Sequence, residues 1–116
     1  MQKPTIIQLS AFDITQKIIE SLSNVCTRSV LFSVKNESKD ATQIADELKI
    51  SLSTVYKTLS TLEDLALAEV DRYVISTEGK KIKLYRSRIG KVEITLDDLE
   101  PSLNLYSNTS NPKLNS

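Results

Sequence analysis

The sequence contains no histidine, one cysteine (Cys26) and two glycines (Gly79 and Gly90). Without histidine, the commonest general base and the usual activator of a serine or cysteine nucleophile are missing. A lone cysteine forms no internal disulfide, and it makes a four-ligand structural zinc site very unfavourable. Two glycines cannot build a glycine-rich phosphate loop. The sequence therefore favours a protein that is not an enzyme and has no cofactor and no metal site.

An excess of charge and long apolar runs are also absent. Fifteen Lys and Arg balance fifteen Asp and Glu in 116 residues, so attraction to a polyanion depends on where the charges lie. No apolar run approaches the roughly 18 residues of a membrane span, and the N-terminus lacks the apolar segment of a signal peptide. The length suits one compact domain. We expect a soluble, cytoplasmic protein with no membrane contact.

Apolar residues at helical spacing predict four helices. The stripe that includes Ile14 and Ile18 predicts a helix over 12–22, preceded by an N-terminal arm, 1–11. A second helix starts at Ser23 or Asn24, either of which can cap it, and ends before the polar run 35–40.

The next two helices are separated by a few residues only. Thr42 is positioned to cap a short helix over 43–49, and Ser51 to cap a longer helix over 52–65. The predicted buried positions of the longer helix are Val55, Leu59, Leu62 and either Leu65 or Ala66. A short helix, a tight turn and a second helix make a helix-turn-helix.

After residue 69 the apolar period changes from 3.6 to 2. Residues 70–75 and 81–86 alternate as two strands, with Gly79 in the loop between them, which predicts a β-hairpin. Residues 91–100 suit a further strand or a short helix. Residues 101–116 are rich in Ser and Asn, and we expect a flexible tail there.

Three helices, the last two in helix-turn-helix form, followed by a hairpin form a winged helix-turn-helix domain, here over 12–90. The predicted fold class is α+β, mainly α, with a three-helix core and a β-hairpin wing. The segment 42–69, TQIADELKISLSTVYKTLSTLEDLALAE, resembles the core of ArsR-like winged-helix regulators of prokaryotes. That resemblance implies a DNA-binding dimer with the helix 52–65 in the major groove and the wing, about 69–86, on the phosphate backbone.

Two departures from that family pattern stand out. Many relatives have glycine where Lys49 and Ala66 stand here, so either the turns use other dihedral angles or each residue bears a cost on the order of 1 kcal/mol in a left-handed conformation. Metal-sensing relatives need clustered ligands, and this chain offers Cys26 without any histidine. Residues 53–59 also look like the recognition helix of Fur-type regulators, whose histidine-rich metal sites are missing here.

The polar face of the helix 52–65 is the predicted DNA-reading surface. With Val55, Leu59 and Leu62 facing inward, the outer face presents hydroxyls and an ammonium group, which can donate to phosphates and base edges. The candidate contacts of this helix are Ser51, Leu52, Ser53, Thr54, Tyr56, Lys57 and Ser60. Thr42 and Gln43 are candidates at the start of the preceding helix.

The wing is locally basic although the chain is neutral. The stretch from Arg72 to Lys91 contains seven Lys and Arg and a single acidic residue, Glu78, which gives it a net charge of plus six. The candidate phosphate contacts are Arg72, Lys80, Lys81 and Lys83. The alternative is that these lysines keep an edge strand from pairing with another chain.

One recognition helix spans only a few base pairs, so we expect a homodimer that binds two half-sites of double-stranded DNA. The candidate dimer contacts are Ile6, Ile7, Ile14, Ile18 and Leu22, and the strand near 92–96 is a second candidate surface. The alternative function is a winged-helix protein-interaction module in a nucleoprotein assembly, with Tyr56 as an apolar anchor. The sequence does not specify the operator, the sense of regulation or a small-molecule effector.

Overall fold

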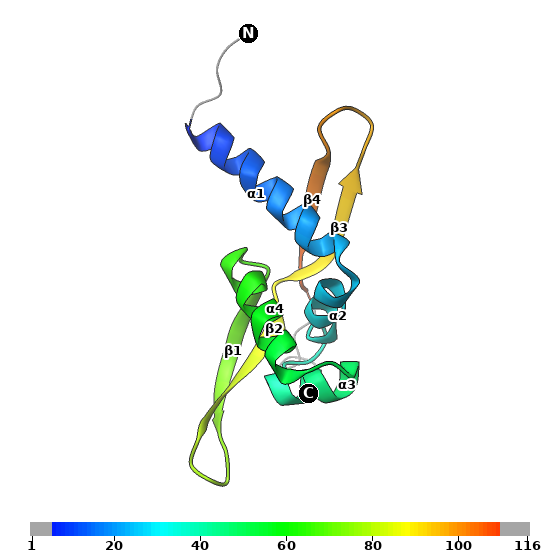
Figure 1. Ribbon diagram of the computed structural model, residues 1–116. Helices are drawn as coiled ribbons and strands as arrows, with labels where there is room; N and C mark the ends of the chain where they lie inside the picture. Colours follow the sequence, from blue (N-terminus) through cyan, green and yellow to red (C-terminus); the bar gives the residue numbers. More distant parts are fainter. Residues whose placement is uncertain (1–5, 110–116) are drawn as a thin grey trace.

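The computed structural model describes the backbone of residues 6–109 and the side chains of residues 13–109. Four helices are followed by two antiparallel hairpins (Figure 1). The helices are α1 (Ile6–Ser23), α2 (Val25–Ser33), α3 (Ala41–Leu48) and α4 (Leu52–Asp64). The strands are β1 (Ala68–Ile75), β2 (Lys81–Ser87), β3 (Ile89–Thr95) and β4 (Ser102–Ser107).

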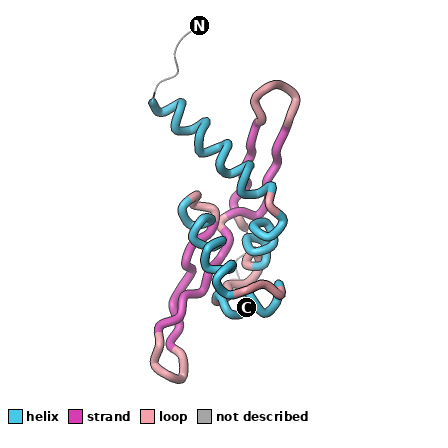
Figure 2. The backbone as a smooth tube through the Cα atoms, viewed as in Figure 1, coloured by secondary structure: helices cyan, strands magenta, loops and turns pink. Residues whose placement is uncertain are grey.

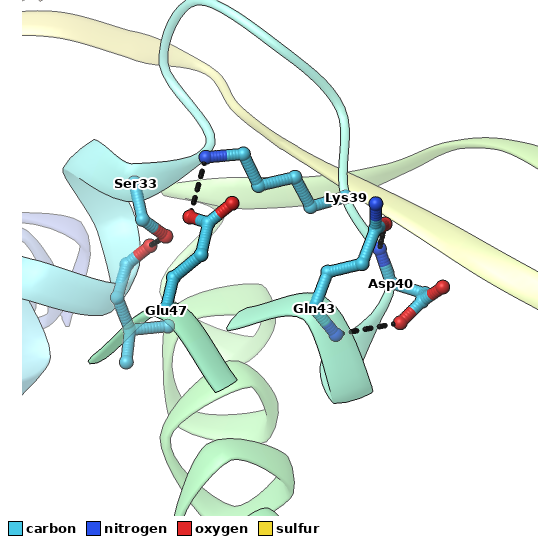
Figure 3. A network of polar contacts seen from close by, with 6 residues as sticks. Ser33, Lys39, Asp40, Gln43 and Glu47 are labelled. Atoms are coloured by element: carbon cyan, nitrogen blue, oxygen red, sulfur yellow. Dashed lines mark hydrogen bonds and ion pairs between the residues drawn. The ribbon is translucent and has the colours of Figure 1, made fainter. Parts of the chain in front are cut away.

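Capping residues set most of the helix starts. Asn24, one of the two candidates, caps α2 by accepting the backbone N–H of Thr27, and Ser51 caps α4 as predicted. The expectation for Thr42 is wrong, because Asp40 caps α3 in a reciprocal box with Gln43 (Figure 3). The helix α3 therefore runs over 41–48 instead of 43–49.

Helix α1 begins well before the predicted start at residue 12. It starts at Ile6, so the expected N-terminal arm 1–11 is wrong from residue 6 onward. The stretch from Ile6 to Asp13 contains no proline or glycine that would stop the helix from extending backward.

The core lies where the four helices meet the base of the first hairpin. Val55, Leu59 and Leu62 of α4 are all buried, which confirms the predicted inner face of that helix. Ile18 and Leu22 of α1 belong to the same cluster. These two side chains were expected at a dimer surface, and that expectation is wrong because the chain's own α1 stripe is needed to close the core.

Within residues 6–109, two residues other than glycine adopt a left-handed backbone. Lys49, at the end of α3, and Ala66, after α4, both have φ of 59°. These are the two positions where glycine was expected from the family resemblance, so the turns keep the left-handed geometry and the chain tolerates its cost. The loop glycine Gly79 has φ of 82°, as the hairpin prediction requires.

We expect Lys49→Gly to stabilise the protein by about 0.5–1 kcal/mol, because glycine relieves the left-handed strain but adds entropy to the unfolded chain. Urea unfolding followed by circular dichroism measures this. Lys49→Ala is the matched control: it removes the same side chain but keeps the Cβ, and it should give no gain. Equal stabilisation by both variants would show that the lysine side chain, not the backbone, is the source.

A second hairpin follows the wing, in place of a single added strand or helix. β3 and β4 pair from Ile89↔Ser107 to Thr95↔Ser102. The expected flexible tail, 101–116, is therefore wrong for residues 102–107, while residues 110–116 lie outside the described part. Asn108 anchors the end of β4: its Nδ2 donates to the carbonyls of Lys35 (2.7 Å) and Ser87 (2.9 Å).

The molecule is elongated, 61 × 31 × 25 Å. The β1–β2 wing projects from the helical part at one end, and the β3–β4 hairpin and α1 extend in the opposite direction (Figures 1 and 2). Among the described residues, no helix is both long enough and apolar enough to cross a membrane.

Candidate nucleic-acid interface

Helix α4 presents a continuous polar face to solvent. Ser53, Lys57 and Ser60 are exposed and stand opposite the buried Val55, Leu59 and Leu62. Tyr56 flanks this face with 53% of its surface exposed, and Leu52 is 41% exposed at the start of the helix. The face predicted from periodicity is therefore accessible over the first three turns of α4.

Hydroxyl groups gather at the N-terminus of α4. Ser51 Oγ accepts the backbone N–H of Thr54 (3.2 Å) and donates to Thr54 Oγ1 (2.8 Å), and Ser53 Oγ lies 3.2 Å from Ser51 Oγ. Because Thr54 Oγ1 accepts in this arrangement, its own hydrogen can point to an external acceptor. The positive end of the helix dipole adds to this, so the N-terminus suits a phosphate oxygen.

Side chains from three separate elements line one groove between the helix-turn-helix and the wing. The N-terminus of α3 contributes Asp40, Ala41 and Thr42, and α4 contributes Tyr56. The wing contributes Lys80, Lys81, Ile82, Lys83 and Tyr85. Five of the predicted contacts, Thr42, Tyr56 and the three wing lysines, are thereby brought together although up to 41 positions separate them in the sequence.

Arg72 does not join this group. Residues directly opposite in an antiparallel pair share a face, and Arg72 pairs with Leu84, whereas Tyr73 pairs with Lys83 and Ile75 with Lys81. Arg72 thus lies on the face of the wing opposite Lys81 and Lys83. Its guanidinium also bonds Asp71 at 3.0 Å, so part of its charge is neutralised locally.

Tyr73 is a member of the groove side that sequence reasoning missed. Lys81 Nζ lies over the Tyr73 ring, 4.2 Å from the ring centre, and this cation–π contact holds the lysine beside the groove. If side chains alternated strictly along β1, Tyr73 would lie on the same face of the strand as Asp71. No sequence signal identified the change of face, which comes from the strand pairing.

The acidic side of the groove was also unexpected. Asp40 lines it, and its Oδ1 accepts the backbone N–H of Gln43 at 2.8 Å. The Oε1 of Gln43 accepts the N–H of Asp40 at 2.9 Å, so this predicted DNA contact retains only its Nε2 as a donor to an outside partner (Figure 3). Tyr85 is buried and also lines the groove, and burial first and the Glu63 carboxylate second raise the pKa of its hydroxyl. That hydroxyl therefore stays protonated and remains a donor.

The candidate dimer residues fall into three groups. Ile18 and Leu22 are in the core, Ile14 is 50% exposed on α1, and the side chains of Ile6 and Ile7 lie outside the described residues. Ile14 borders a second hollow, between α1 and α4, together with Leu65. It is the one member of the set that the described part leaves available.

Comparison with solved structures identifies the same fold in the crystal structure of NolR from Sinorhizobium fredii. The two chains superpose with a TM-score of 0.58 at 20% sequence identity, over 75% of this chain and 81% of NolR. NolR is an ArsR-family winged helix-turn-helix transcriptional regulator. The match confirms the predicted fold class. No family model matches the chain, and no curated protein matches it significantly.

Proposed function

We propose that this winged-helix protein is a sequence-specific, cytoplasmic DNA-binding transcriptional regulator that acts as a homodimer. Helix α4 enters the major groove, with Ser53, Thr54, Tyr56, Lys57 and Ser60 toward the bases and Ser51 and Leu52 at the entry. Lys80, Lys81 and Lys83 of the wing contact the phosphate backbone. Thr42 and Gln43 contact phosphates beside the recognition helix. The fold shared with NolR supports this general function.

The observation that carries the proposal is the groove between α4 and the wing. Three lysines and two polar residues from distant segments converge there, at the edge of an exposed helix face of hydroxyls and Lys57. A helix in the major groove brings the adjacent phosphates to such a position, where clustered ammonium groups release counterions and increase affinity. A merely solvated surface does not require cations from the wing and donors from α3 and α4 to converge.

Selection from a random duplex library tests the proposal. We expect a defined motif with two related half-sites about one helical turn apart, because a symmetric dimer presents two equivalent helices. Recovery of no motif, together with binding that ignores sequence, would overturn the assignment of α4 as the reading element. A single half-site would retain the reading element but contradict the dimer.

Exposed apolar side chains on the wing favour one alternative, a protein-interaction module. Val74 and Ile75 near the wing tip are exposed, as are Leu52 and Tyr56 of α4. An interface built on these residues would depend weakly on salt, whereas DNA binding weakens steeply as salt increases. Affinity measured from 50 to 300 mM salt therefore separates the two functions.

The surface proposed for dimerisation is the apolar face of the β3–β4 hairpin, together with Ile14 of α1. Val92 and Ile94 pair with Leu105 and Leu103, so these four share one face, while Lys91, Glu93 and Tyr106 occupy the other. Val92 and Leu103 reach the core, but Ile94 and Leu105 are 41% and 39% exposed. An isolated two-stranded hairpin is only marginally stable in water, so a second copy that covers this face would stabilise it.

Ile94→Asp is expected to raise the dimer dissociation constant at least about tenfold, because it places a charge in an apolar contact. Sedimentation equilibrium measures the change. Thr95→Asp is the matched control, since Thr95 is the next residue but lies on the polar face. If Thr95→Asp dissociates the dimer and Ile94→Asp does not, the wrong face has been assigned.

A further inference from the structure

The wing contains a β-bulge at its base. Ala68, Glu69 and Val70 of β1 pair with Ser87, Arg86 and Tyr85 in regular register, but the next pair is Arg72↔Leu84. Asp71 is therefore an extra residue on β1. A bulge shifts the register by one position, and because side chains alternate with period two, every residue beyond it changes face.

This shift decides which side chains of β1 face the helices together with Lys81 and Lys83. With the bulge, Tyr73 pairs with Lys83 and flanks Lys81, on the side of the wing that lines the groove. Without it, the regular register would pair Arg72 with Lys83 and Tyr73 with Ile82. Arg72 and Val74 would then face the groove, with the guanidinium against Lys83, and Tyr73 would turn away from Lys81. The alternative wing would therefore present a different surface. It would also be less stable at this pair, because like charges directly opposite each other destabilise two paired strands.

The loop between α2 and α3 forms hydrogen bonds with the hairpin at this position. Ser38, which is buried, donates its hydroxyl hydrogen to Asp71 Oδ2 at 2.8 Å. Its neighbour Lys39 forms a two-way backbone bridge with Tyr85, the residue opposite the bulge, with N···O distances of 3.1 and 2.8 Å. Lys39 Nζ also bonds Glu47 of α3 at 2.8 Å (Figure 3). The loop thus contacts both strands at the bulge and is itself tied to the helix-turn-helix.

We propose that Ser38 and Asp71 are positioning residues for the wing: their hydrogen bond holds the bulge and so places Tyr73, instead of Arg72, beside Lys81 and Lys83 on the groove side. This inference rests on the proposed DNA-binding function for its consequence, but the register of the wing is a property of the free protein. In the other register Lys81 loses the Tyr73 ring that positions it and Arg72 crowds Lys83, so DNA binding depends on the native fraction and the apparent affinity falls by that fraction.

The test compares Ser38→Ala with Ser38→Thr, which keeps the hydroxyl, and with Arg72→Ala, which removes the neighbouring ion pair but not the Ser38 bond. Nuclear Overhauser contacts in the free protein report the register directly. We expect Ser38→Ala to weaken the Tyr73–Lys83 contact and to produce an Arg72–Lys83 contact, whereas Ser38→Thr and Arg72→Ala keep the native pattern. Asp71→Ala should reproduce the change from the other partner.

Affinity for the selected duplex is measured in parallel, with thermal unfolding as the check on folding. Ser38→Ala should lower affinity about three- to tenfold, the loss expected when the competent register is populated at roughly one third to one tenth. Native Overhauser contacts in both Ser38→Ala and Asp71→Ala would overturn the inference. If the wild-type protein binds no duplex, the proposed function fails, and the Overhauser comparison still decides whether this hydrogen bond sets the register.

Discussion

Replacing Lys80, Lys81 and Lys83 together by alanine is expected to lower DNA affinity on the order of 100-fold at 0.1 M salt and to do so similarly for every duplex. Each ammonium–phosphate contact contributes about −0.9 to the slope of log affinity against log salt, so three to four contacts in each protomer contribute about −3 to −4, which the triple variant should reduce to about −1 per protomer. The three residues line one side of the groove and are exposed. Fluorescence anisotropy over a salt series measures both quantities.

Two comparisons make this result interpretable. A triple variant of Lys17, Lys35 and Lys91 removes the same net charge from outside the groove and should leave the slope nearly unchanged. Changes at Ser53, Tyr56 or Lys57 should instead alter discrimination between the selected site and its mismatched versions, with a cost of about 1–3 kcal/mol at the affected base pair. Equal loss of affinity and selectivity from the wing and the helix variants would show that the two roles are wrongly assigned.

Leu59→Ala is expected to destabilise the protein by about 3–4 kcal/mol, the largest effect we anticipate on stability. Leu59 is 1% exposed. It lies on the buried side of α4 with Val55 and Leu62, opposite the polar face. Truncation removes its transfer free energy and leaves a cavity, and the loss is a large part of the roughly 5–15 kcal/mol available to a domain. Urea unfolding followed by circular dichroism provides the measurement.

Ser60→Ala is the control, because the neighbouring Ser60 is exposed on the same helix. Its stability should stay within about 0.5 kcal/mol of wild type. A loss below about 1 kcal/mol for Leu59→Ala would contradict the core position of that side chain. Such a result would also remove the basis for orienting the opposite face of α4 toward DNA.

Several features of the fold follow from short-range patterns and were predictable. The inner face of α4 follows from the spacing of Val55, Leu59 and Leu62, and the cap of that helix from Ser51. The hairpin loop at Gly79 follows from a residue that adopts positive φ without strain. The box formed by Asp40 and Gln43 was missed, yet its three-residue spacing is a local signal that could have identified the start of α3.

Other features depend on partners that are distant in the chain. The segment 102–107 carries Leu103 and Leu105 at strand spacing, but its pairing is set by distant partners: β3 supplies its hydrogen bonds, and Asn108 fastens its end to Lys35 and Ser87. Ile18 and Leu22 form an apolar stripe on α1, which the other helices cover in the folded chain. Periodicity identifies the apolar stripe of α1, but it does not distinguish cover by the chain's own core from cover by a second copy.

Helical periodicity, capping residues and turn chemistry were enough to establish the order of elements from α1 to β2 and the polar face of α4, because each depends on interactions within a few residues. The assignment of wing residues to the groove was decided by tertiary structure alone. Arg72 and Tyr73 exchange faces through a bulge at Asp71, and the hydroxyl that bonds this residue belongs to Ser38, 33 positions earlier. Strand register is a long-range property: one extra residue reverses every side chain beyond it, and only the packed loop selects where that residue lies.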